Sequence, residues 1–378
     1  MLAFAAMLQH YRQLIDDPVR LGAFQRAIAT IVRPGDVVAD IGCGLGTYAI
    51  FAARAGARRV FAVDDSPIVE VAREVVRDSG ADKIVELLAG HSTALAPPER
   101  CDVVIFEDYL TTLVSPDKAR VVADIEARWL KPGGRLVPPR ARLWLAPVED
   151  PEGHLHIDRF HWSKDRVFGI DFGATRRRVF ASAHPRKLGA GALLATPELA
   201  HDYDLLQQRR VEVAATRTLT AARDGVIHGL LLWFELELGD AWLGTGPLAP
   251  PSAWQQTLFP LATPIPVSAG APIELALQAA PLGEALVWRW SVAAGGRRVD
   301  ANSLEGTPLR AEALALSRPD HVPAADVELE IDRAILDAVD GRHSIAALAA
   351  LLRARFAARF ADDEAAAARV ARVLSRYA

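Results

Sequence analysis

The sequence is poor in cysteine and has no long hydrophobic run. Only two of its 378 residues are cysteines, Cys43 and Cys101, so no disulfide framework can stabilise the fold. Such scarcity is typical of a reducing compartment, and we predict a cytoplasmic protein. No apolar run approaches the ~20 residues that cross a bilayer, and the N-terminal segment has no basic region before its apolar residues. We therefore predict neither a membrane partner nor a signal peptide.

The sequence also lacks a strong excess of charge of either sign. Its net charge is −4, which argues against a general surface for nucleic acid, and we interpret the basic run from Arg176 to Arg178 as a solvated face. With 51% hydrophobic and 24% charged residues, the composition is that of a globular protein. A chain of 378 residues is longer than one hydrophobic core usually supports, so we expect two or three domains.

The first third of the chain alternates between short apolar runs and segments with helical spacing. The predicted strands are residues 36–41, 59–63, 101–106 and 135–137. Pro138 and Pro139 follow the last of them, where a strand ladder cannot continue. This alternation predicts a parallel α/β sheet in a first domain that ends at about residue 139.

The rest of the chain divides into two sections. From residue 140 to about 313, short β-like runs separated by glycine, proline and aspartate predict an antiparallel barrel or sandwich. The last section, residues 314–378, is rich in alanine and arginine and predicts helices over 332–339, 344–359 and 362–377. Gly341 would end the first of these helices, and Ser344 would cap the second.

Three glycines in five positions directly follow the first predicted strand. In the stretch VADIGCGLGT, Gly42, Gly44 and Gly46 leave bare backbone that permits positive φ and the close approach of a ligand. Asp64 ends the next predicted strand, where its carboxylate can accept hydrogen bonds from both hydroxyls of a ribose. Together these features predict a nucleoside ligand, although the glycine spacing differs from that of dinucleotide sites.

The residues of this region carry a family resemblance. The segment DIGCGLGTYAIFAARAGARRVFAVDDSPI resembles the S-adenosylmethionine-binding region of class I methyltransferases, in particular of protein arginine methyltransferases. Residues 10–28, 129–150, 161–172 and 243–261 resemble, in family order, its N-terminal helix, its domain junction, the start of its barrel and a late barrel loop. The resemblance implies a Rossmann-like sheet followed by an antiparallel β-barrel. It also implies a homodimer, formed through an arm at about residues 176–200.

The same resemblance implies S-adenosylmethionine as the cofactor. The glycine loop would line its methionine portion, Asp64 would hold the ribose, and Arg20 would pair with the carboxylate. Gly90 and His91 would cradle the adenine, with Thr93 standing where the family commonly has glutamate. The candidate cofactor residues are Arg20, Asp40, Gly42, Cys43, Gly44, Gly46, Asp64, Asp65, Gly90, His91 and Glu107.

The acceptor pocket departs from the family pattern. The family holds the guanidinium with two glutamates on the loop after the fourth strand, because a forked cation pairs well with carboxylates. Glu107 matches the first glutamate, but the second position falls at about Pro116, with Asp117 beside it. Ala253 replaces the histidine of a Thr-His-Trp motif. The candidate catalytic residues are Glu107, Asp108, His10 and Trp254, of which His10 and Asp108 have structural roles as alternatives.

The last section resembles a different type of protein. Residues 332–356 resemble the helical part of small winged-helix domains, including the PqqD-type peptide-binding modules found beside enzymes that modify ribosomal peptides. That resemblance implies a peptide substrate with a leader segment. A helical cap that packs on the barrel or mediates assembly is an equal alternative. DNA binding is disfavoured, because the candidate recognition helix is rich in alanine and offers few polar side chains to bases.

These features predict an enzyme that transfers a methyl group from S-adenosylmethionine to a side-chain nitrogen of a peptide or protein, without a metal. One carboxylate instead of two suits an acceptor that is smaller or less cationic than histone arginine. The second hypothesis is a methyltransferase for small molecules, whose acceptor pocket would be closed and apolar. The third is a non-catalytic partner protein, against which the complete set of cofactor residues argues.

Overall fold

The structure is a computed structural model that describes residues 2–113, 115–160, 168–207, 211–283, 285–308, 311–316 and 318–377. The chain forms two compact units, Met1–Pro308 and Leu309–Ala378. Among the described residues, every helix is too short or too polar to cross a membrane. Part of the barrel motif expected at 161–172 lies outside the described residues, because the description resumes at residue 168.

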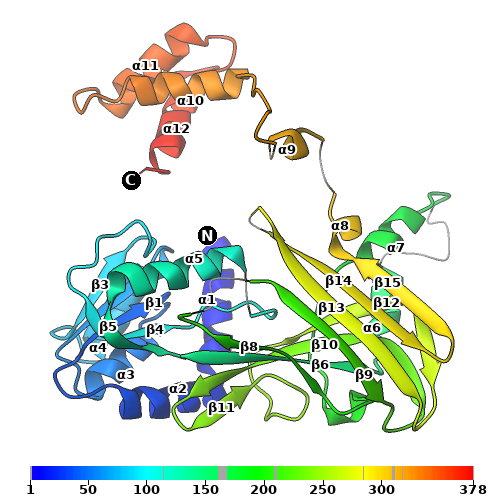
Figure 1. The fold of residues 1–378 in the computed structure, drawn as a ribbon. Coiled ribbons are helices and arrows are strands. Elements are labelled where there is room, and N and C mark those ends of the chain that lie inside the picture. The colour runs from blue at the N-terminus through cyan, green and yellow to red at the C-terminus, as the bar shows by residue number, and fades with distance from the viewer. Residues whose placement is uncertain are drawn as a thin grey trace. The chain divides into compact units, whose positions relative to one another are not determined.

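A five-stranded parallel sheet forms the first part of the larger unit (Figure 1). Its strand order is β3-β2-β1-β4-β5, with β1 (Val37–Ile41), β2 (Arg59–Asp64), β3 (Val85–Ala89), β4 (Cys101–Phe106) and β5 (Leu130–Val137). The sequence patterns predicted β1, β2 and β4 to within one residue, since these strands are nearly continuous apolar runs. They missed β3, which Glu86 interrupts, and they began β5 at residue 135. Leu130 already pairs with Cys101, and a register shift separates it from the pair of Arg135 with Val103.

Six helical segments accompany the parallel sheet. They are α1 (Leu2–Ile15), α2 (Pro18–Ile31), α3 (Thr47–Arg54), α4 (Ile68–Asp78), α5 (Pro116–Asp124) and the π-helical turn η1 (Ile125–Trp129). Asp17 caps α2, because its side chain accepts a hydrogen bond from the Arg20 N–H and Pro18 stands at the first helical position. Ser115 caps α5 in the same way, and Pro116 follows it.

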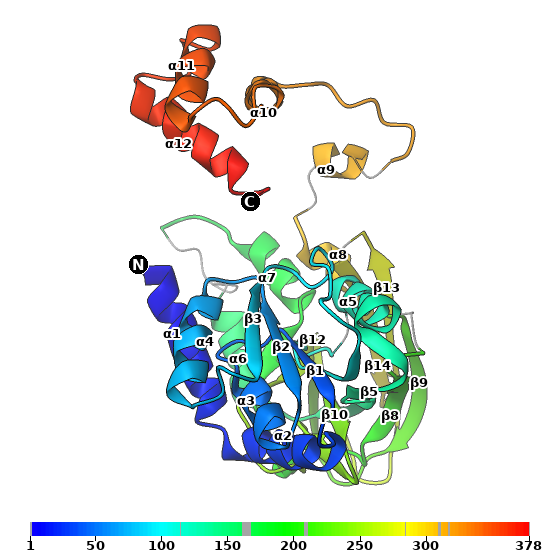
Figure 2. The same ribbon diagram turned by 90° about the vertical axis from the view of Figure 1, so that its left-hand side faces the viewer.

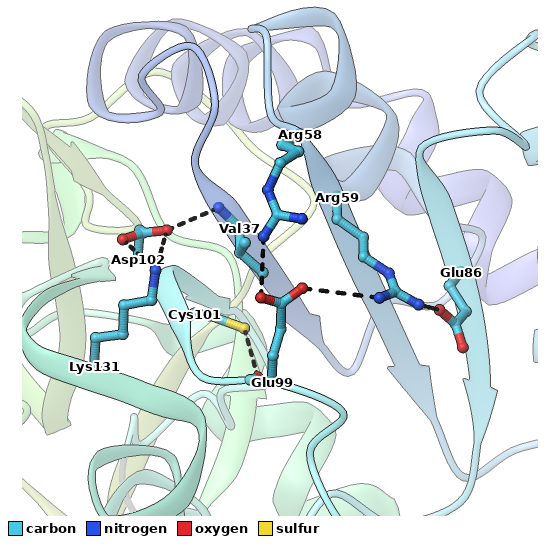
Figure 3. Close-up of polar contacts among 8 residues, drawn as sticks. All are labelled: Val37, Arg58, Arg59, Glu86, Glu99, Cys101, Asp102 and Lys131. Atoms are coloured by element: carbon cyan, nitrogen blue, oxygen red, sulfur yellow. Dashed lines mark hydrogen bonds and ion pairs between the residues drawn. The ribbon is translucent and has the colours of Figure 1, made fainter.

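Ion pairs join the strands at the edge of the sheet where they begin (Figure 3). Asp102 accepts a hydrogen bond from the Val37 N–H at 2.9 Å and binds the Lys131 ammonium at 2.8 Å. Glu99 pairs with Arg58 at 3.0 Å, and Arg59 pairs with Glu86 at 2.6 Å. These contacts connect the amino ends of the strands, so the carboxyl ends are left for a ligand.

Two antiparallel sheets make up the rest of the larger unit (Figure 1). The main hydrophobic core joins them to the parallel sheet, and a second, smaller core lies among β6, β10, β12, α6 and α7. The first has the order β7-β12-β10-β6-β8, with β11 paired to β10, and the second has the order β15-β14-β13-β9. The strands are β6 (Arg140–Val148), β7 (His184–Arg186), β8 (Glu198–Asp204), β9 (Val213–Thr220), β10 (Gly225–Leu238), β11 (Ala241–Gly244), β12 (Gln256–Val267), β13 (Pro272–Leu282), β14 (Ala285–Ala294) and β15 (Arg297–Asn302). This arrangement is barrel-like, as predicted.

Short helices also interrupt this region, which the sequence patterns had represented as strands and turns. They are α6 (Pro151–Phe160), α7 (Gly173–Phe180), the 3-10 turn η2 (Ala190–Ala192) and α8 (Ser303–Gly306). The segment expected to form an arm, residues 176–200, runs through α7, β7, η2 and the start of β8.

The smaller unit is helical, with α9 (Ala311–Leu316), α10 (Val327–Asp337), α11 (Ile345–Arg355) and α12 (Asp363–Leu374) (Figure 2). It has its own hydrophobic core, in which Ile331 and Ile335 of α10 contact apolar side chains of α11 and α12. Ser344 caps α11, as its residue type predicted. Gly341 takes a φ of +74°, but it does not end α10 as predicted, because that helix ends at Asp337 with Ala338 as its C-cap. Helix α10, predicted over 332–339, begins at Val327, five residues before its predicted start, because Asp326 caps it.

Candidate active site

A cavity of about 970 Å³ lies at the carboxyl ends of β1, β2 and β4, beside α1 and the barrel loop that contains Trp254. The predicted site residues that line it are His10, Arg20, Gly42, Cys43, Gly44, Asp64, Asp65, Gly90, His91, Glu107, Asp108 and Trp254. Asp40 and Gly46 lie behind its wall. The fold therefore gathers residues that are far apart in the sequence into one hollow.

The glycine loop folds back over the end of β2. The N–H groups of Gly42 and Cys43 both donate to the Val63 carbonyl, at 2.8 and 2.9 Å. Gly44 has a φ of +53°, and a Cβ there would lie only 2.5 Å from Cε1 of Tyr11, which extends from α1. The positive φ at Gly44 agrees with the sequence pattern. The close neighbour that also excludes a side chain is Tyr11, where the pattern had predicted a ligand.

Asp64 is buried at the end of β2, and it is held by the same loop. Its Oδ2 accepts a hydrogen bond from the Gly44 N–H at 2.9 Å, and its Oδ1 accepts bonds from the N–H and the hydroxyl of Ser66, at 2.9 and 2.6 Å. Because carboxylate oxygens have several acceptor positions, these bonds orient the side chain and leave it able to accept hydroxyl donors from the cavity.

Asp40 supports the loop from behind. It is 1% exposed, and its Oδ2 accepts a hydrogen bond from the Ala49 N–H at 2.9 Å, which joins β1 to the first turn of α3. Burial raises the pKa of the Asp40 carboxyl to about 7. Gly46 caps α3 in the left-handed conformation, with φ at +77°. Both residues therefore shape the loop rather than line the cavity.

Arg20, Tyr48 and Glu107 form a buried polar group between the glycine loop and the barrel. Arg20 forms an ion pair with Glu107 and donates to the Tyr48 hydroxyl at 2.8 Å and to the Leu14 carbonyl at 3.0 Å. The Tyr48 hydroxyl donates to Oε2 of Glu107 at 3.0 Å. Burial raises the pKa of Glu107 to about 7, although the Arg20 charge opposes this shift.

The barrel loop reaches this group through Asp17. The Ala253 N–H donates to Oδ2 of Asp17 at 2.6 Å, while Oδ1 of the same carboxylate caps α2 at the Arg20 N–H. Trp254 lies with its ring 5.7 Å from the Arg20 guanidinium, within cation–π range. At the position where the family has histidine, the backbone N–H of Ala253 therefore binds the Asp17 carboxylate.

The other end of the cavity carries the departures from the family pattern. Pro116 begins α5 instead of supplying a carboxylate, and Lys118 lines the cavity, where it pairs with Asp108 and lies 3.8 Å from Asp117. On the same loop, Leu113 has a φ of +68°, a strained value of the kind that persists where surrounding structure imposes it.

The two histidine candidates have local contacts. His10 is exposed on α1, where its ring lies edge-on to Tyr11 at 5.8 Å. Nδ1 of His91 lies 2.7 Å from the Thr93 hydroxyl, and the Gly90 N–H donates to the Asp64 carbonyl at 2.9 Å. The loop after β3 is thus attached to the end of β2.

Sequence reasoning missed three residues of this site: Tyr11, Tyr48 and Lys118. Tyr48 is the second residue of α3 and lies two positions after Gly46, so its position just after the glycine loop was a usable signal. Tyr11 and Lys118 gave none, because only the packing of α1 and α5 brings their side chains to the cavity.

The residues present fit S-adenosylmethionine. Gly42, Cys43 and Gly44 of the glycine loop line the cavity, and Asp64 stands at the adjacent strand end. Nε of Arg20 is buried without a hydrogen-bond partner among the described residues, so it can still donate to a ligand carboxylate. The described residues include no group of three or more histidine, cysteine or acidic side chains that could hold a metal ion.

Comparisons with known proteins agree with this geometry. Residues 38–134 match the model of a methyltransferase domain, and residues 139–285 match that of the arginine methyltransferase oligomerization subdomain. A probable protein arginine N-methyltransferase 6 of Arabidopsis thaliana is 29% identical over 311 residues, which cover 70% of this chain and 71% of that protein. A probable histone-arginine methyltransferase 1.3 of the same plant is 28% identical over 284 residues. The match covers 71% of this chain but only 53% of that protein.

Solved structures show the same fold. The PRMT1 enzyme-prozyme heterotetrameric complex with AdoHcy from Trypanosoma brucei superposes with a TM-score of 0.70 at 23% identity, over 77% of this chain and 97% of that one. Protein arginine methyltransferase 10 of Arabidopsis thaliana gives a TM-score of 0.67 at 23% identity, over 78% and 98%. The sheet, the matched domains and the cofactor cavity together identify the chain as a protein arginine methyltransferase-like, class I S-adenosylmethionine-dependent methyltransferase.

Proposed function

We propose that the enzyme methylates a side-chain nitrogen of a peptide or protein, with arginine as the first acceptor to test. The curated relatives named above are probable arginine methyltransferases, which supports arginine. Three residues that line the cavity are also exposed to solvent. The side chains of Asp108 and Asp117 are 56% and 44% exposed, and Leu110 is 51% exposed. An acceptor carried on a peptide can therefore reach the cavity from solvent, which favours a peptide over an enclosed small molecule.

The buried carboxylate of Glu107 is the observation that carries this proposal. When bound, S-adenosylmethionine supplies a methyl group that its sulfonium charge already activates. The chain must then align an unprotonated nitrogen and exclude water. Arg20 and Tyr48 both use Oε2 of Glu107, so we assign Oε1 to the acceptor nitrogen. There the carboxylate would orient the nitrogen and stabilise the positive charge that develops on it.

Substitution of Glu107 tests this assignment. In Glu107→Gln we expect kcat for an arginine peptide to fall by about 10²-fold or more, the size typical of one lost charge-stabilising group. We expect calorimetry to give a cofactor Kd near that of the wild type. Glu99→Gln is the control, because it removes a carboxylate at the opposite edge of the sheet. Full activity of Glu107→Gln would mean that other residues orient the acceptor.

We also propose that residues 309–378 recruit the peptide. Their helices form a unit with its own core, and Leu329, Ile345 and Leu351 are 49–55% exposed on it. Exposed apolar side chains of this kind suit contact with an amphipathic segment, such as the leader of a ribosomal peptide precursor.

The match to an oligomerization subdomain supports a homodimer as the assembly.

A further inference from the structure

Lys118 occupies an unusual place for a cation. It is the third residue of α5, and its N–H donates to the Ser115 hydroxyl that caps the helix. The first turn of a helix carries positive partial charge, which disfavours a cationic side chain there. The Lys118 side chain is also only 19% exposed, so water solvates its charge poorly. A lysine at this position needs nearby carboxylates to compensate for both effects.

Asp108 and Asp117 supply that compensation. Lys118 forms an ion pair with Oδ2 of Asp108, and its Nζ lies 3.8 Å from Oδ2 of Asp117. All three side chains line the same cavity as Glu107, and Asp108 directly follows Glu107 in the chain. The amine of Lys118 thus pairs with Asp108 and lies near Asp117, two carboxylates of the cavity that Glu107 also lines.

A guanidinium is recognised by pairing with carboxylates, often in a forked arrangement. At this cavity a cation of the chain itself already pairs with Asp108 and lies near Asp117. We propose that Lys118 is a specificity-determining residue that competes with a cationic acceptor for Asp108 and Asp117. The presence of Lys118 then lowers the preference of the enzyme for a guanidinium over a neutral acceptor. This inference rests on the proposed function, because it takes the cavity to be the acceptor site.

The charges set the size of the effect. The Asp108 side chain is 56% exposed, so its pair with Lys118 is screened by water and can be displaced. Lys118 therefore weakens the binding of a guanidinium without excluding it. Removing one partly solvated charge at contact distance should change the affinity by about three- to tenfold.

Two peptides that differ only in the charge of the acceptor test this inference. One carries a single central arginine among glycine and alanine residues, and the other carries citrulline, the uncharged isostere, at the same position. Calorimetry with the full chain and saturating S-adenosylhomocysteine gives the ratio of the citrulline Kd to the arginine Kd. In Lys118→Met we expect this ratio to rise about three- to tenfold. The KM for the arginine peptide should fall by a similar factor at nearly constant kcat.

Two further variants control for the loss of a side chain. Lys118→Arg keeps the charge, so its ratio should stay at the wild-type value. Arg58→Met removes a cation at the opposite edge of the sheet, where Arg58 pairs with Glu99 at 3.0 Å and neither residue lines the cavity, and should also leave the ratio unchanged. The cofactor Kd of each variant reports that its fold is intact.

The possible results separate the two proposals. If the wild type methylates the arginine peptide but Lys118→Met shows an unchanged ratio, the role of Lys118 is wrong and the proposed function stands. If neither peptide binds or is methylated while the cofactor binds normally, both proposals are wrong. A rise in the ratio in Lys118→Met alone supports both.

Discussion

At the scale of single residues, Glu107 combines burial with charge in a way that controls activity. It is enclosed by Arg20 and Tyr48, and burial raises its pKa to about 7 from an ordinary value of 4.5. The assigned role needs the ionised carboxylate, because only that form accepts hydrogen bonds and stabilises positive charge at both oxygens. The protonation of this one group therefore becomes visible in the pH dependence of the reaction.

We predict that kcat/KM rises with pH through a midpoint near 7 and that Glu107→Gln lacks this rise in its residual activity. The measurement is a series of initial rates between pH 5.5 and about 8.5 in buffers of equal ionic strength, centred on the Glu107 pKa. Stability should change in the opposite direction. Because the folded chain holds this proton more tightly than the unfolded chain, the free energy of unfolding falls as pH rises from 4.5 to about 7. A wild-type rate that does not change between pH 6 and about 8 would contradict the assignment.

At the scale of secondary-structure elements, the glycine loop and α1 must fit against each other. Gly44 has positive φ, and its missing side chain leaves room for Tyr11 of α1. The absence of a side chain at Gly44 thus lets α1 pack against the loop. Burial raises the pKa of Tyr11 to about 12, so its hydroxyl stays protonated against Asp64 and Ser66.

We predict that Gly44→Ala weakens cofactor binding by tenfold or more, since the new Cβ would lie 2.5 Å from the Tyr11 ring. Gly80→Ala is the matched control: Gly80 also has a positive φ, +69°, but a Cβ there would meet no atom within 4 Å. Alanine at positive φ costs about 1 kcal/mol of backbone strain in both variants. The difference between their cofactor Kd values therefore reports the contact between the new Cβ and the Tyr11 ring. Equal cofactor Kd values for the two variants, measured by calorimetry, would show that the contact does not matter.

At the scale of the whole molecule, the chain separates cofactor binding from the helical unit. The residues that line the cavity all lie before residue 309, in a unit with its own continuous core. Residues 309–378 have a separate core formed by α10, α11 and α12. Each unit can therefore retain its fold when the other is altered.

We predict that a chain ending at Pro308 folds and binds S-adenosylmethionine with an affinity within about twofold of the full chain. If the helical unit recruits the peptide, the same truncation raises the KM for a leader-bearing peptide and leaves that for a short peptide unchanged. Thermal unfolding, cofactor calorimetry and initial rates with both peptides give these values. Loss of cofactor binding on truncation would show instead that the helical unit supports the larger one.

The sequence by itself determined the elements whose cause is local. Apolar runs specified β1, β2 and β4, the glycine loop took positive φ at Gly42, Gly44 and Gly46, and Ser344 capped α11 as its residue type predicted. The family motifs also gave the order of the sheet and the barrel. In each case a few neighbouring residues carry the physical reason, so it can be read along the chain.

Only the tertiary structure decided which distant side chains meet. Asp17 bonds to the Ala253 N–H across 236 positions, and Lys118 turns into the cavity to bind Asp108. Tyr11 packs on Gly44 because α1 lies against the loop. These contacts depend on how whole elements pack, and burial then sets the pKa of Glu107. Packing and desolvation act through space, so no local pattern in the sequence could have specified them.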